Sequence, residues 1–232
     1  MGGYKGGEMA STTLIEESKK HFETFKDTKI EDVEDFFQTI VDNTTQSLKQ
    51  KVEAHEGYID PHTTVAFALI QEHSVFVGNI GDSRVYIFED GAFKQRSKDH
   101  SVVEYLFDIG RIREKDMATH PDQNKLLRSI NAKESSEISF FERELKDENF
   151  AVLVCSDGFW EGVSKEEMSK NLFLDKELKT SLDEMVSIAL KNGGERCDNI
   201  SVVACVSLEN FVPKSMLSKI DEMFKSWRKK WF

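Results

Sequence analysis

The 232-residue chain is poor in proline and cysteine, and it has no apolar run long enough for a membrane span. Three prolines leave no proline-rich linker. The three cysteines are Cys155, Cys197 and Cys205. They are odd in number and not closely spaced in pairs, which favours reduced thiols over a disulfide framework. A membrane span needs about 20 apolar residues, and no apolar run here approaches that length. The first residues also lack the basic and then apolar stretches of a secretory signal. We therefore expect a cytoplasmic protein.

Basic residues are also in the minority, with 31 Lys and Arg against 42 Asp and Glu and a formal net charge of −11. Phosphate backbones attract basic surfaces, so this charge argues against nucleic acid as the main partner. An acidic surface suits a protein that concentrates divalent cations, but it equally suits one that is merely soluble. The length allows one substantial domain with a full core.

Periodicity predicts helices at both ends of the chain and strands between them. Residues 7–26 and 31–55 follow the three- and four-residue spacing of amphipathic helices. Four short runs rich in β-branched and aromatic residues come next, at 62–70, 74–80, 83–88 and 92–97. Turn residues separate them, so they predict an antiparallel meander.

The second half of the chain predicts a more mixed order of elements. Residues 101–134 are polar, with a short helix expected at 101–110. Further strands are expected at 138–145, 150–155 and 199–206, and helices at 164–172, 177–192 and 213–231. Strand blocks flanked by helices are typical of an α+β sandwich, in which helices cover the sheets.

Two aspartates stand where predicted strands begin or end. Asp157 directly follows the strand FAVLVC, and Asp198 directly precedes NISVVACV. If these strands are antiparallel neighbours, both carboxylates lie at one sheet edge, and Gly158 allows the backbone to come close to a ligand there. Paired carboxylates serve as an acid and base couple or bind hard cations such as Mg²⁺ or Mn²⁺. The two aspartates alone do not choose between these uses.

Three longer stretches resemble one enzyme family. They are VGNIGDSRVYIFEDGAFKQRSKDHS (77–101), VLVCSDGFWEGVS (152–164) and CDNISVVAC (197–205). Their motifs and order resemble those of the metal-dependent PP2C-type (PPM) protein serine/threonine phosphatases. The resemblance extends over residues 1–208 and implies a four-layer α-β-β-α sandwich with antiparallel sheets.

The resemblance implies a reaction and a metal site. Members hydrolyse phosphoserine and phosphothreonine in proteins, the products of serine/threonine kinases, by attack of a metal-activated water. They use two Mg²⁺ or Mn²⁺ ions, and bacterial members have a third, weaker site. The resemblance implies Asp157 and Asp198 as metal ligands. Asp99 of KDHS is either a ligand of the third site or an exposed carboxylate in a turn. In GDSR, Asp82 is implied to be structural and Arg84 a buried hydrogen-bonding centre.

The chain departs from the family pattern in three places. MGGYKGGEMAS resembles the first metal-binding loop from its methionine onward, and the family's preceding strands and Asp-Gly pair are absent. We therefore expect an N-terminally truncated fold and, as an alternative function, a weak or inactive phosphoprotein-binding domain. His62 replaces a glycine, either as an extra ligand or as an exposed histidine. Phe159 and Trp160 are expected to pack in the core.

Residues 209–232 form a separate region in the sequence pattern. Apolar residues at helical spacing form a stripe: Leu217, Ile220, Phe224, Trp227 and Trp231. Three basic residues lie near its end: Arg228, Lys229 and Lys230. Such a helix can contact an anionic membrane surface or a partner through residues 213–231. It can equally fold against its own domain, where the helix dipole favours basic residues at the C-terminal end.

Overall fold

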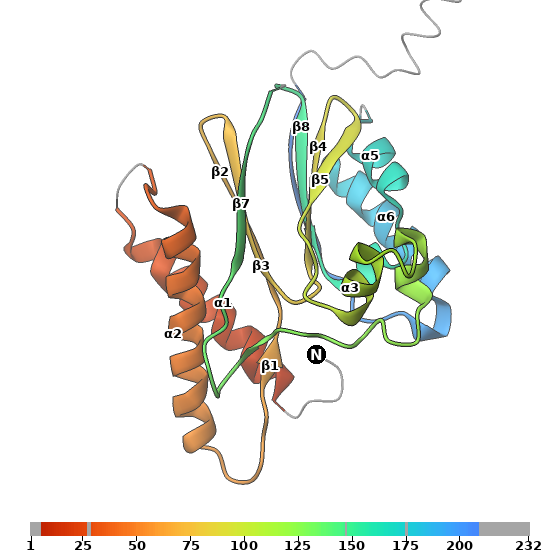
Figure 1. Cartoon of the computed structure of the whole chain (residues 1–232). Helices are drawn as coiled ribbons and strands as arrows, with labels where there is room; N and C mark the ends of the chain where they lie inside the picture. The colour runs from red at the N-terminus through yellow and green to blue at the C-terminus, as the bar shows by residue number, and fades with distance from the viewer. Residues whose placement is uncertain (1–5, 27–28, 147, 175, 209–232) are drawn as a thin grey trace, which may run out of the picture.

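Two antiparallel sheets face each other, with helices on both outer faces (Figure 1). The computed structural model describes residues 6–26, 29–146, 148–174 and 176–208. The first sheet has the order β2-β3-β7, and its strands are β2 (Val65–Gln71), β3 (Ser74–Ile80) and β7 (Ser139–Glu144). The second has the order β5-β4-β8-β9, and its strands are β4 (Arg84–Glu89), β5 (Ala92–Arg96), β8 (Phe150–Cys155) and β9 (Val202–Ser207). The predicted α+β sandwich is confirmed.

Four longer helices form the outer layers. The first sheet is covered by α1 (Gly7–Thr24) and α2 (Val33–Glu53), and the second by α5 (Lys165–Leu172) and α6 (Leu178–Gly193) (Figure 1). At the start of α5, Ser164 and Glu167 form a capping box that satisfies free backbone N–H groups. The described chain also has short elements: α3 (Val102–Asp108), α4 (Asp157–Trp160), the 3-10 turns η1 (Glu114–Thr119) and η2 (Gly194–Arg196), and the paired strands β1 (His62–Thr63) and β6 (Ile130–Asn131).

Apolar side chains fill three spaces between the four layers. Phe37 of α2 stacks on Phe67 of β2, with ring centroids 4.8 Å apart, in the core beneath the first helix pair. Between the two sheets, a smaller aliphatic cluster includes Val75, Val77, Val85, Ile87 and Val152. The third core lies under α5 and α6 and includes Phe88, Phe159, Trp160, Met168 and Met185.

The predicted single meander is wrong, because its strands belong to different sheets. β3 pairs with β2 and β7, whereas β4 pairs with β5 and β8. The chain crosses from one sheet to the other at Gly81 and Asp82. Gly81 has φ of +99°, and a Cβ atom there would lie 2.3 Å from Cγ2 of Thr64. The predicted strand 62–70 is also divided at Thr64 into β1 and β2, which lie in separate sheets.

Several predicted boundaries need smaller corrections. β9 begins at Val202 rather than at residue 199, and the sequence did not predict β6, α4, η1 or η2. The region 209–232, with its expected helix at 213–231, lies outside the described residues. None of the helices in the described part of the chain is both long and apolar enough to cross a membrane.

We predict that Gly81→Ala destabilises the protein more than Gly57→Ala does. Both glycines have φ near +100°, where an alanine costs about 1–3 kcal/mol. Only Gly81 adds a clash, since a Cβ at Gly57 meets no atom within 4 Å. Overpacking adds about another 1–3 kcal/mol. Urea unfolding of both variants measures the difference, and equal losses would show that the crossing tolerates a side chain.

Candidate metal centre

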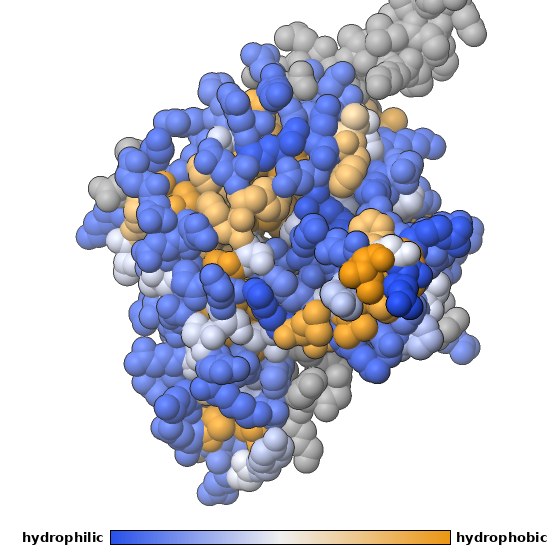
Figure 2. Space-filling model, viewed as in Figure 1, coloured by the Kyte–Doolittle hydropathy of each residue, from blue (hydrophilic) through white to orange (hydrophobic). Residues whose placement is uncertain are grey.

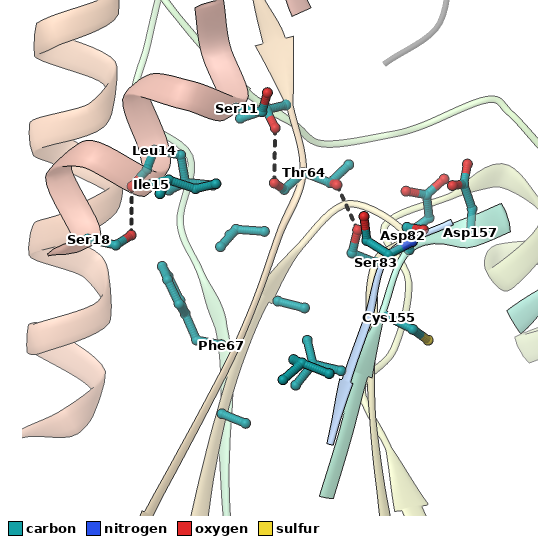
Figure 3. A pocket seen from close by; sticks show the side chains of 18 of the residues that line it. Ser11, Leu14, Ile15, Ser18, Thr64, Phe67, Asp82, Ser83, Cys155 and Asp157 are labelled. Carbon is teal, nitrogen blue, oxygen red and sulfur yellow. Dashed lines mark hydrogen bonds between the residues drawn. The ribbon is translucent and has the colours of Figure 1, made fainter. Parts of the chain in front are cut away.

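A cavity of about 1350 Å³ lies where α1, β2 and the crossing at Asp82 meet the ends of β8 and β9 (Figure 3). Apolar side chains line one part of it, among them Leu14, Ile15, Phe67 and Val202. Carboxylates line its other end: Asp82, Asp157 and Asp198. Elsewhere on the surface, Figure 2 shows an apolar patch over α3 and the chain near it, where Ile109 and Leu127 are exposed.

Strand register brings Asp157 and Asp198 to the same edge of the second sheet. Cys155 at the end of β8 pairs with Val202 at the start of β9, so the residues just beyond them are neighbours. Ser156 joins the two segments, because its hydroxyl donates to the Asn199 carbonyl at 3.0 Å. The fit is close, since a Cβ at Gly158 would lie 2.8 Å from the carbonyl oxygens of Asp198 and Asn199.

Asp82 is a third carboxylate at this end of the cavity. It lies on the crossing between the sheets, and Figure 3 shows its side chain beside that of Asp157. The Trp160 indole N–H donates to the Asp82 carbonyl at 2.9 Å and fixes this part of the backbone. Burial and the nearby charge of Asp157 raise the pKa of Asp82 to about 7. Sequence reasoning gave Asp82 a structural role and missed this position.

Glu161 adds a fourth acidic group to the same region. It follows Asp157 by four residues at the end of α4, a spacing that places both on one helical face. Burial, followed by the charges of Asp157 and Asp82, raises the pKa of Glu161 to about 7. Burial and the charge of Asp198 also raise the pKa of Asp157. The four carboxylates therefore repel one another in a partly desolvated site.

This set of oxygen donors fits a hard divalent cation. Within the described ranges, no three His, Cys, Asp or Glu side chains converge closely enough to hold one ion by themselves. Mg²⁺ commonly binds through one or two carboxylates and keeps several waters, so a pair of these aspartates is enough for one ion.

Asp99 occupies a different position from the other predicted ligands. Arg84 donates two hydrogen bonds to its carboxylate, Nε to Oδ1 at 2.8 Å and Nη2 to Oδ2 at 2.6 Å. The same guanidinium donates to the Tyr86 hydroxyl and lies 3.4 Å from the centroid of the Trp160 ring. The Asp99 side chain is fully buried and does not line the cavity. Arg84 is thus the buried centre that the resemblance implied, and the role of Asp99 in a third metal site stays a prediction.

Comparison with known proteins identifies the family. Residues 1–196 match the family described as protein phosphatase 2C. The chain belongs to this family. It is 29% identical over 206 residues to the serine/threonine phosphatase stp of Listeria innocua, covering 88% of this chain and 80% of that protein.

Solved structures of protein phosphatase 2C relatives have the same fold. The serine/threonine phosphatase Stp1 from Staphylococcus aureus superposes with a TM-score of 0.79 at 26% identity, over 90% of this chain and 81% of that one. The catalytic domain of the phosphatase PstP, described in complex with two manganese ions, gives a TM-score of 0.70 at 27% identity, over 87% and 82% of the two chains. The chain is thus a PP2C-type serine/threonine phosphatase by family.

His62, a departure from the family pattern, is neither exposed nor in the cavity. Its Nδ1 lies 2.7 Å from the Ser129 hydroxyl, and its Nε2 lies 3.4 Å from Oδ1 of Asp60. The side chain is 15% exposed, so the expectation of an exposed histidine is wrong. His62 instead joins β1 to the segment before β6. Phe159 and Trp160 are buried, as predicted.

We predict that Asp82 makes the metal-free protein less stable as the pH rises. An unfolded aspartate has a pKa of about 3.9, whereas in the fold the pKa of Asp82 is about 7. A raised pKa means that the stabilising contribution is complete below about pH 4 and is lost as the pH rises through about 7. The difference in melting temperature between Asp82→Asn and the unchanged chain should therefore increase in favour of the variant from pH 5 to pH 8. A constant difference would contradict the raised pKa.

Proposed function

We propose that the chain hydrolyses phosphoserine and phosphothreonine in proteins, with divalent ions held at Asp157 and Asp198. Membership of the protein phosphatase 2C family supports the reaction class. The single observation that supports the site is the placement of both aspartates at one rim of the cavity, on segments that Ser156 joins. The natural substrates are then phosphoproteins made by a serine/threonine kinase.

The chemistry of the residues supports Mg²⁺ or Mn²⁺ as the cofactor. Carboxylate oxygens are hard ligands that suit both ions, and the relative PstP is described with two manganese ions. When bound, such ions lower the pKa of a water and neutralise charge on the phosphoryl oxygens. The protein's part is to hold Asp157 and Asp198 in place. Asp157 is fixed at the start of α4, where its Oδ1 accepts the Gly158 N–H at 2.9 Å.

The alternative function is a weak or inactive domain that binds phosphoproteins without hydrolysing them. It is favoured by one observation, that no three potential ligand side chains converge on one point in the described residues. The two functions differ in turnover. A domain that only binds retains a phosphopeptide without releasing phosphate, whereas an enzyme releases phosphate and requires the metal.

We predict that Asp157→Asn and Asp198→Asn each lower kcat/KM for Mn²⁺-dependent phosphopeptide hydrolysis by at least about 100-fold, because each removes an anionic ligand. Asp183→Asn is the matched control, since the Asp183 side chain is exposed on the outer face of α6 and forms an ion pair with Lys179. Phosphate release over a Mn²⁺ titration is the measurement. Phosphopeptide binding by the unchanged chain without any turnover would favour the alternative, and full activity in Asp157→Asn would refute the site.

Contact of residues 213–231 with an anionic membrane surface or a partner also stays a proposal. It rests on the apolar stripe and the basic cluster in the sequence. We predict that deleting residues 213–232 reduces sedimentation with vesicles rich in phosphatidylserine, while phosphopeptide hydrolysis continues. Unchanged sedimentation would leave packing against the domain as the role of this segment.

A further inference from the structure

An apolar groove between two edge strands lies open in the described part of the chain. β2 is the last strand of the first sheet and β9 the last strand of the second, and residues of both line the cavity of the metal centre. Ile15 and Phe22 of α1 and Val203 of β9 also line it, and each is more than half exposed. Figure 3 shows Ile15 and Phe67 pointing into this space. Proteins normally cover such an edge, often with a helix, because an open apolar edge attracts other chains.

We propose that the groove binds the C-terminal tail of the same chain, residues 209–232, with its apolar stripe against α1, β2 and β9. The tail directly follows the segment that contains β9 and lies outside the described residues. Of the roles that the sequence allows for residues 213–231, this one is packing against the domain. The stripe must leave the groove before it can contact a membrane. The inference does not depend on the proposed function, because docking needs no turnover.

The length of the stripe fits the groove. β9 begins beside the rim that carries Asp157 and Asp198, the acidic rim, and its last residue, Ser207, lies at the opposite end. A helix that starts beyond Ser207 must therefore run back along β9 to cover the groove. The stripe, residues 217–231, is about 21 Å long in a helix. The seven residues of β2 span about 23 Å, so the stripe and the edge match in length.

The charges of the tail and the cavity are complementary. The charged residues that line the cavity are mostly acidic: Glu8, Asp82, Asp157 and Asp198, against Lys19. The tail carries six basic and three acidic residues, in a chain whose net charge is −11. Its basic cluster, residues 228–230, lies about 24 Å from residue 213 in a helix. A helix that runs back along β9 places this cluster at the acidic rim, where opposite charges attract each other.

The reactivity of Cys205 in the full chain tests the docking. Cys205 is exposed and lies two residues after Val203, so the two side chains share the groove face of β9. A docked tail covers this thiol. Phe224→Asp should release the tail, because the variant places a charge within the apolar stripe. Cys205 should then react with iodoacetamide at least about 10-fold faster than in the unchanged chain, where the open state is a minor population.

Ser226→Asp is the matched control for this variant. It adds the same charge two residues away, about 200° around the helix from Phe224, and should leave the Cys205 rate unchanged. Mass spectrometry follows each cysteine separately, and the buried Cys155 should stay unreactive in every variant, which shows that the domain remains folded. Equal Cys205 rates in the unchanged chain and in Phe224→Asp would overturn the proposal.

Two further measurements identify other occupants of the groove. The proposal predicts a monomer by light scattering and a Cys205 rate that does not depend on protein concentration. A dimer whose Cys205 protection increases with concentration would place a second copy in the groove. Protection that appears only with phosphatidylserine vesicles would assign the stripe to a membrane. Either result would overturn the proposal.

A phosphopeptide assay on the same samples separates this inference from the proposed function. Protected Cys205 in a chain that releases no phosphate refutes only the proposed function. An active chain in which Cys205 reacts equally fast with and without Phe224→Asp refutes only the docking.

Discussion

Repulsion between carboxylates where the two sheets meet is the constraint on which the rest of this structure depends. Asp82, Asp157 and Glu161 are partly or largely buried there, and burial is the main cause that raises the pKa of each. The charge of Asp157 adds to this effect at Asp82 and Glu161, and the charge of Asp198 adds to it at Asp157. A fold normally relieves such repulsion by separating the groups. Here the contacts of Trp160 and Ser156 hold them together. The structure is therefore one that a bound proton or a bound cation stabilises.

Arg84, a basic side chain near the acidic rim, pairs with another carboxylate. Arg84 lies close to the acidic rim, yet both of its carboxylate hydrogen bonds go to Asp99. This separates two kinds of buried acid. Asp99 is neutralised within the protein and strengthens the link between β4 and the segment after β5. Arg84 acts on Asp82 only through its charge, which lowers the pKa of Asp82 less than burial raises it. This arrangement suits the proposed binding of divalent ions, because an arginine paired with the rim carboxylates would compete with a metal for them.

The sequence predicted the local elements and part of the site, and the reasons are specific. β8 was predicted at its observed bounds because six apolar residues end at a Ser-Asp-Gly turn. Asp157 and Asp198 were expected together because antiparallel pairing fixes which strand ends meet. The sequence did not show that β3 and β4 belong to different sheets. A turn at Gly81 has the same residues whether the next strand pairs with β3 or enters another sheet. Asp82 was given a structural role because the resemblance implied one for the GDSR turn. Glu161 was missed because the four-residue α4 is too short to show a helical period.

The most direct test of the account is a crystal structure of the chain soaked in Mn²⁺, with the ions located by anomalous scattering. The account predicts anomalous peaks within bonding distance of Asp157 and Asp198. Peaks confined to other parts of the surface, or a filled site at Asp99 with the Asp157 rim empty, would contradict it.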